Sequence, residues 1–181
     1  MAGNPTNVKI WEDADVRILK PSAIVDPATF TTLTPADIDE PWDPLWLLAG
    51  LLNGSDGFGE SREWDESEHT AWGYGLVKVS SRNFKMTRTF TALEANATTD
   101  YLYSPGDTAG KVIVAKPALA YLGFETTADD GTVERLITTM PSRITAPESN
   151  RNEEDLASRE FTCNIFPNSA KELFIRQVTA P

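Results

Sequence analysis

One segment alternates between apolar and polar side chains, and it constrains the fold more than any other part of the chain. The even positions of residues 84–94 are mostly apolar, with one arginine among them: Phe84, Met86, Arg88, Phe90 and Ala92. The odd positions are polar: Lys85, Thr87, Thr89 and Thr91. Successive side chains of a β-strand point to opposite faces, so this spacing predicts a strand with one face toward a core and one toward water.

Further short segments with β-forming side chains lie on both sides of this strand. They are residues 8–11, 16–19, 76–80, 112–115, 119–126, 132–139, 156–166 and 171–178. In residues 156–166, Phe161, Cys163 and Ile165 share one face, and Asp-Gly turn chemistry at residues 128–131 predicts a hairpin. Residues 46–52 fit either a buried strand or a pair of helical turns.

The stretches between these strands predict turns, loops and one helix. Residues 94–103 predict a short helix that ends at Pro105-Gly106, and residues 82–83 predict a turn. Residues 24–33 suit an irregular connection, and residues 146–155 an exposed loop. About seven or eight short strands with one flanking helix indicate a mainly β fold, a β-sandwich or barrel. A length of 181 residues favours a single domain over 1–181.

Composition excludes several classes of protein. The single cysteine, Cys163, rules out an intramolecular disulfide framework and a multi-cysteine metal site. A net charge of −11 argues against a protein that grips nucleic-acid phosphates. The apolar runs are shorter than the roughly 20 residues that span a bilayer, and the first residues lack the pattern of a secretion signal. We therefore expect no membrane association.

The negative charge is concentrated in residues 37–69. This stretch holds ten acidic residues and one arginine, which give −9 of the net charge of −11. It predicts a long acidic loop, either exposed with tryptophans that close a core edge, or an arm that orders against a neighbouring subunit. The candidate interface residues of this arm are Trp42, Trp46, Glu60, Trp64, Asp65, Glu66 and Trp72.

No enzyme signature stands out in the chain. The one histidine, His69, lacks a Gly-x-Ser-x-Gly partner motif, and Cys163 suits a buried, inert thiol. The acids of residues 60–68 form a dense run that is more typical of a solvated segment than of a glycosidase pair. Asp129 and Asp130 fit a turn better than a calcium loop. We expect no catalytic activity, no cofactor and no metal.

Residues 56–106 carry a sequence of motifs in a recognisable order. Ala71-Trp72-Gly73, the run from Phe90 to Glu94, and Asn96 match best. This order resembles the major tail tube proteins of long, non-contractile-tailed bacteriophages. About fifty residues match by motif and the rest by layout, and the proline-rich stretch 22–46 departs from the family. The chain also stops before the immunoglobulin-like decoration that some family members append.

The resemblance implies a structural virion protein. Copies would pool strands into a β-barrel ring, expected to be hexameric, and rings would stack into a tube through which the genome passes. The threonine face, with Lys85, Thr87, Thr89 and Thr91, would line a wet channel or face solvent. Partners would be the chain itself, the tape measure, tail terminator and distal tail proteins, and double-stranded DNA that passes without specific binding. The protein would be made in the host bacterial cytoplasm and end in the phage tail.

Two other functions stay open at this level. A monomeric β-sandwich could bind carbohydrate or act as an adhesin, with Trp42, Trp64 and Trp72 as a platform for sugar rings. A hydrolase would need two carboxylates of residues 60–68 in one cleft.

Overall fold

The computed structural model describes residues 8–114, 116–146, 149–150, 153 and 156–179. Strands account for 49% of the chain and helices for 10%, so the fold is mainly β, as predicted. The strands are β1 (Trp11–Leu19), β2 (Leu47–Leu48), β3 (Gly59–Ala71), β4 (Gly75–Ala92), β5 (Ala118–Ala128), β6 (Val133–Thr138), β7 (Ser142–Thr145), β8 (Ser149–Asn150), β9 (Ser158–Ile165) and β10 (Phe174–Val178). The helices are α1 (Pro27–Leu33), α2 (Ala97–Tyr103) and a 3₁₀ turn at Pro21–Ala23.

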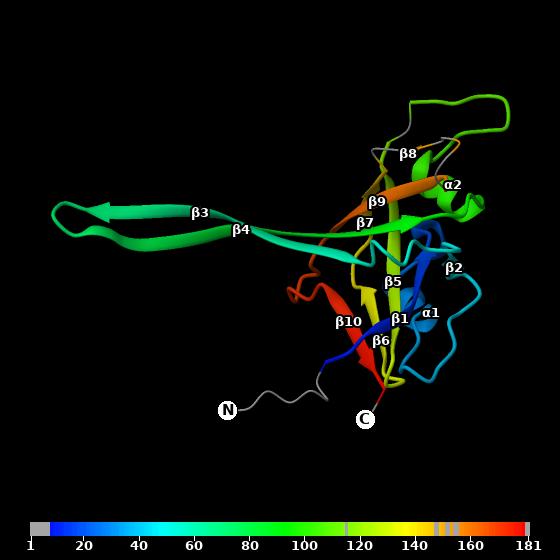
Figure 1. Ribbon diagram of the computed structural model, residues 1–181, viewed down its shortest axis with the longest axis horizontal. Coiled ribbons are helices and arrows are strands. Elements are labelled where there is room, and N and C mark those ends of the chain that lie inside the picture. The colour runs from blue at the N-terminus through cyan, green and yellow to red at the C-terminus, as the bar shows by residue number, and fades with distance from the viewer. Residues whose placement is uncertain (1–7, 115, 147–148, 151–152, 154–155, 180–181) are drawn as a thin grey trace.

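All strand pairs are antiparallel, and the long strand β5 joins two halves of the sheet. Along most of its length β5 pairs with β1 and β6, and β10 continues this half beyond β6. At its first residues, Ala118–Ala120, β5 pairs instead with β7, which leads to β9, β4 and β3. The two halves pack against each other in the body of the molecule, at the right of Figure 1.

Three phenylalanines from both halves form the centre of the core. Phe90 of β4 stacks on Phe161 of β9 with ring centroids 5.0 Å apart, and it meets Phe124 of β5 edge-on at 6.4 Å. The alternation predicted in β4 and β9 is confirmed, because Met86 and Cys163 are also buried on the same faces. In these strands every second side chain is buried, because successive side chains of a strand point to opposite faces and only one face meets the core.

Helix α2 confirms the predicted short helix. Asn96 caps it by accepting hydrogen bonds from the backbone N–H groups of Thr98 and Thr99, at 2.9 and 3.0 Å. The Thr99 hydroxyl in turn accepts from the backbone N–H of Asn96, which completes a capping box. Leu102 is buried and anchors the helix on the sheet.

Two predicted elements of the body are wrong. Residues 24–33 contain helix α1 rather than an irregular connection, because Asp26 caps it and Pro27 occupies its first position, where proline is favoured. Residue 115 lies outside the described residues, and residues 112–114 of the predicted strand 112–115 form no strand. They belong instead to an exposed loop, whose turn is closed by two hydrogen bonds between Thr108 and Lys111.

The bounds of several strands also differ from the predicted ones. The two predicted strands near the N-terminus form one strand, β1, and residues 46–52 contain only the two-residue strand β2. Within the predicted loop 146–155, Ser149–Asn150 pairs with β9 as β8, and residues 147–148, 151–152 and 154–155 lie outside the described residues. The Asp-Gly turn is confirmed, with Gly131 at φ 80°. Neither described helix is long and apolar enough to cross a bilayer.

Strands β3 and β4 form a long hairpin that projects from the body (Figure 1). The predicted turn at residues 82–83 is wrong: Asn83, at φ 53°, lies in a bulge where Trp64 faces both Asn83 and Phe84. The predicted loop over residues 37–69 is also wrong for residues 59–69, because β4 pairs with this segment along its length. A residue such as asparagine with a positive φ is found in bulges as well as in turns, and only the pairing of the two strands distinguishes a bulge from a turn.

Candidate subunit interface

The outer part of the β3–β4 hairpin, residues 64–84, is a ribbon of two strands alone. Strand β9 pairs with β4 only from Met86 to Ala92, so beyond Met86 each hairpin strand has only the other beside it. Residues 60–79 are all exposed. We call residues 64–84 the outer hairpin. Isolated two-stranded hairpins are marginally stable in water, so we expect another molecule to pack against this ribbon.

One face of the outer hairpin carries aromatic and aliphatic side chains between acids. Trp64 and Phe84 contact each other across the strands, with ring centroids 5.2 Å apart. Further out on the same face, the register places Glu68 opposite Val79 and Thr70 opposite Leu76. This face continues the core-facing side of β4, yet no described part of the chain covers it.

The tip of the hairpin presents two aromatic rings to solvent. The turn is closed by a hydrogen bond from the backbone N–H of Tyr74 to the carbonyl of Ala71. Gly73 has φ 80°, which an L side chain rarely adopts, so glycine suits this position. Trp72 is 100% exposed and Tyr74 86%. Large, fully exposed aromatic side chains are typical of contact surfaces.

The opposite face of the hairpin is polar and pairs opposite charges. Asp65 accepts hydrogen bonds from Asn83 at 2.9 Å and from Lys85 at 3.5 Å, and these partners lower the pKa of its carboxyl. The Nε2 atom of His69 lies 3.3 Å from the Ser80 hydroxyl. Residues 59–92 hold five acidic and five basic side chains, so the hairpin is formally neutral.

The candidate channel residues Lys85, Thr87 and Thr89 lie on this polar side and extend into a wider surface. The register places Thr87 between Ser61 and Asn164, and Asn164 is in turn opposite Arg143. Thr89 is likewise beside Thr162, which pairs with Thr145. Polar side chains therefore run across four strands, from β3 to β7. Thr91 is buried, where residues 51–53 pair alongside β4.

Trp42 and Trp46 lie on the body, apart from the hairpin. Trp46 is buried, and its indole N–H donates to the carbonyl of Leu33 at 2.8 Å. The Trp42 indole N–H donates to Glu125 at 2.9 Å, and the Arg135 guanidinium lies 4.5 Å above its ring. The predicted single loop over residues 37–69 is therefore wrong, because the stretch has two structurally different parts. Its first part closes the core edge, and its second part is strand β3.

The remaining predicted interface residues, Glu60, Trp64, Asp65, Glu66 and Trp72, all lie on the hairpin or its tip. Sequence reasoning missed Tyr74, Leu76, Val79 and Phe84 as members of the same surface. Their nearness to Trp64 and Trp72 follows from the β3–β4 register. The Gly-x-Gly spacing at residues 73–75 is the one local signal that could have located the turn.

The thiol of Cys163 is expected to be unreactive in the folded protein. Its side chain is completely buried, and burial raises the pKa of the thiol above its usual range. A thiol reagent added at pH 8 should therefore label the protein only after urea unfolds it. Stoichiometric labelling within minutes in buffer without urea would contradict this burial.

Among known proteins, chains similar to this one are found in solved structures. No family model and no curated protein matches the chain. Among solved structures, the chain is similar to one from the "Cryo-EM Structure of an Extracellular Contractile Injection System, PVC sheath-tube complex in extended state". The two share 13% sequence identity, and the match covers 68% of this chain and 80% of the other, with a TM-score of 0.38.

Proposed function

We propose that this chain is a structural subunit that assembles with its own copies into rings, which stack into a phage tail tube. The observation that carries the proposal is the outer hairpin, a long two-stranded ribbon with exposed aromatic residues and no cover from the described part of its own chain. A ribbon of this kind gains stability when a second copy packs against its apolar face. Trp64, Trp72 and Tyr74 are the anchors of that contact.

The free edge of β3 favours closure of a ring. In the described chain β3 pairs only with β4, so its outer edge presents unpaired backbone donors and acceptors. Such edges pair with other strands, and a closed barrel of pooled strands removes them. We propose a ring of six copies, which is the number that the resemblance to tail tube proteins implies.

The polar surface across β3, β4, β9 and β7 suits the wall of a water-filled channel. Its threonine, serine and asparagine side chains have hydroxyl and amide groups that can hydrogen-bond to water, and Glu63 lies opposite Lys85. A wall without clustered cations lets double-stranded DNA pass without holding it. The role is structural and not catalytic, in the tail of a virion, with other tail proteins at the ends and inside of the tube.

The structure does not favour the other two functions. A sugar-binding platform needs Trp42, Trp64 and Trp72 on one face, but Trp42 packs on the body, and Trp72 lies at the hairpin tip. A hydrolase needs paired carboxylates in a cleft, but Glu63, Glu66 and Glu68 lie on the open ribbon of β3.

Assembly of the purified full chain tests the proposed function. Concentrated protein should give rings of constant diameter with a stain-filled centre in negative-stain electron microscopy, together with stacks of rings. Sedimentation velocity should show the monomer converting to large species as concentration rises. A folded protein that sediments as a monomer at every concentration, with and without a preformed tail tip as nucleus, would contradict the proposal.

A further inference from the structure

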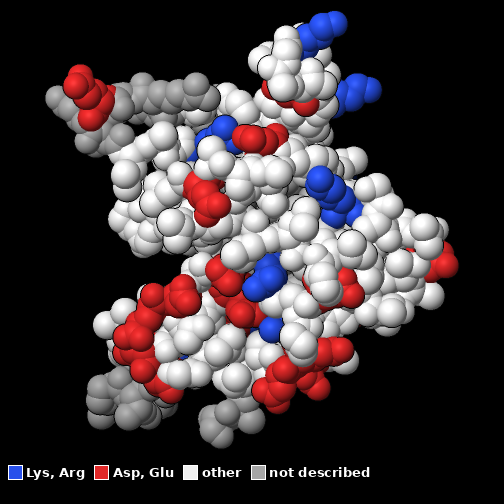
Figure 2. All heavy atoms as spheres, turned by 90° about the vertical axis from the view of Figure 1, so that its right-hand side faces the viewer, with Lys and Arg blue, Asp and Glu red and all other residues white. Residues whose placement is uncertain are grey.

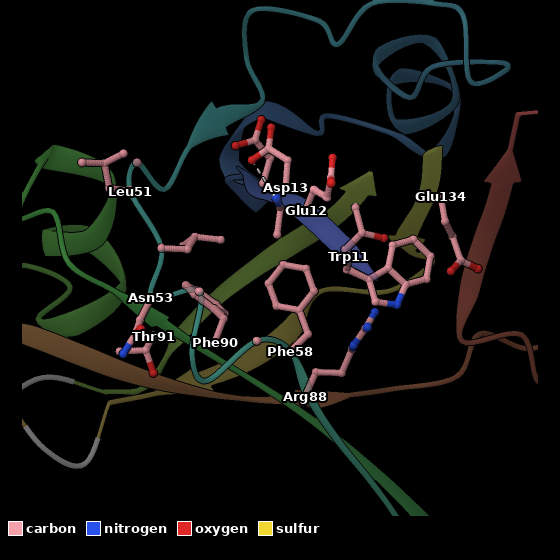
Figure 3. A pocket seen from close by; sticks show the side chains of 17 residues that line it. Trp11, Glu12, Asp13, Leu51, Asn53, Phe58, Arg88, Phe90, Thr91 and Glu134 are labelled. Carbon is pink, nitrogen blue, oxygen red and sulfur yellow. Dashed lines mark hydrogen bonds between the residues drawn. The ribbon is translucent and has the colours of Figure 1, made fainter. Parts of the chain in front are cut away.

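A pocket of about 530 Å³ lies between the start of β1, residues 50–58 and β4. Figure 3 shows Phe58 and Phe90 side by side within it, with Glu12 and Asp13 of β1 above them and Trp11 of β1 to the right of Phe58. The floor is apolar and the rim is acidic. The rim carboxylates are Glu12, Asp13, Asp15 and Glu134. The proposed ring interface on the outer hairpin makes no use of this pocket.

Arg88 lines the pocket as a buried cation. It is 8% exposed, and its guanidinium lies 4.5 Å from the ring centre of Phe124 and 5.6 Å from that of Phe58. In Figure 3 its side chain extends from β4 toward Trp11. Its Nε and one terminal nitrogen have no hydrogen-bond acceptor among the described residues. A buried donor without an acceptor is costly, and a buried charged donor more so.

The carboxylates near Arg88 lie too far away to accept a hydrogen bond from it. The Glu60 Oε2 forms an ion pair with the Arg88 Nε at 3.7 Å, and the other oxygen of Glu60, Oε1, accepts from Arg62. Glu134 on the rim accepts from Arg176 at 2.5 Å. Among the described residues, the Nε and one terminal nitrogen of Arg88 thus have an ion-pair partner but no hydrogen-bond acceptor, and an acceptor from another copy would satisfy them. The acidic rim repels anions, so a neutral acceptor such as a backbone carbonyl fits best.

One exposed loop of this chain has the matching chemistry. Residues 108–114 form a turn in which Thr108 and Lys111 exchange two backbone hydrogen bonds of 3.1 Å, and the Asp107 carboxylate accepts from the N–H of Ile113 at 3.0 Å. Val112 is 87% exposed, and Val114 is fully exposed. The loop thus has a backbone fixed by its own hydrogen bonds, exposed apolar side chains and the cation of Lys111.

The loop and the pocket lie apart on the body. Figure 1 places the loop at the top, whereas the elements that line the pocket, β1, β4 and the segment before β3, lie in the middle and lower parts of the body. Figure 2 shows basic atoms on the uppermost projection and acidic atoms gathered on the lower half. Because the loop and the pocket lie apart within one copy, they can meet only between two copies, and a contact between two different surfaces repeats from each copy to the next.

We propose that the 108–114 loop of one copy inserts into the Arg88 pocket of the next copy along the tube. A loop carbonyl accepts from the Arg88 guanidinium, Lys111 pairs with Glu12 and Asp13, and the valines cover Phe58. This contact rests on the proposed function, since it is the joint between stacked rings. It uses residues that the ring contact through the outer hairpin does not.

Charge reversal tests the pairing of loop and rim. Lys111→Glu and Asp13→Lys, both exposed positions, should each leave rings intact but shorten the stacks at least tenfold in electron micrographs. The double variant should recover stack length, because the opposite charges again face each other. Normal stacks in either single variant, or no recovery in the double variant, would overturn the loop–pocket contact. Failure of the unaltered chain to form rings would instead contradict the proposed function.

Cysteine crosslinking tests the same contact by position. Val112→Cys combined with Gly54→Cys places one thiol on the loop and one on the pocket, where an added Cβ at position 54 meets no atom within 4 Å. Under mild oxidation, assembled protein should give a ladder of disulfide-linked multimers in denaturing gels. The matched control, Val112→Cys with Val25→Cys, moves the second thiol to an exposed site outside the pocket. Equal ladders in both variants, or none in the first, would overturn the contact.

Discussion

Replacing residues 64–84 with a two-residue Asn-Gly turn is expected to abolish ring formation while the body stays folded. Nearly every residue removed is exposed, and none belongs to the core, so the free energy of unfolding should change by less than about 1 kcal/mol. Asn-Gly closes a two-residue hairpin with the correct twist. Sedimentation velocity and negative-stain electron microscopy measure assembly, and urea unfolding measures stability.

The matched control removes an exposed apolar side chain far from the hairpin. Val25→Ser changes a residue that is 84% exposed, next to helix α1, and it should assemble as the unaltered chain does. Rings of normal diameter from the protein without its outer hairpin would show that another surface closes the ring. A body that unfolds would show that the ribbon contributes to the fold.

Phe124→Ala is expected to have the largest effect on stability, a loss of about 3–5 kcal/mol in the free energy of unfolding. Phe124 is 2% exposed and contacts Phe58 and Phe90 from the opposite half of the core. The substitution opens a cavity and also removes the ring nearest the Arg88 guanidinium. Small domains are stable by only about 5–15 kcal/mol, so this loss is a large share. Urea unfolding at concentrations that keep the chain monomeric measures it.

Phe84→Ala removes the same side chain from the outer hairpin and serves as the control. Phe84 is exposed and contacts Trp64 alone among aromatic rings of the described chain, so its loss should cost less than about 1 kcal/mol. An equal cost for the two substitutions would contradict the position of the core between the two halves of the sheet.

Local patterns predicted the elements whose burial repeats every second residue. The faces of Met86 and Phe90 in β4 and of Phe161 and Cys163 in β9 follow directly from this alternation. The Asp-Gly turn before β6 and the Asn96 cap of α2 also follow, because their hydrogen bonds join residues within a few positions of each other. These features depend only on neighbours along the chain.

Two of the failures have a common physical cause. Residues 112–114 are apolar and β-branched but form no strand, because a strand exists only where another edge is free to pair. Asn83 has the composition of a turn but lies in a bulge, because the pairing of β3 continues past it. In both places the local preference is overruled by what lies across from the segment.

The acidic stretch, residues 37–69, shows most clearly which features depend on the sequence alone and which depend on the tertiary structure. The sequence by itself determined that residues 37–69 hold most of the negative charge and that Arg88 interrupts an apolar face. The tertiary structure decided that residues 37–58 close the body, that β4 neutralises the charge of β3, and that Arg88 lies against rings from β5 and the segment before β3. Alternation is a local property of the backbone, whereas the partners of each charge are set by strand register between distant residues.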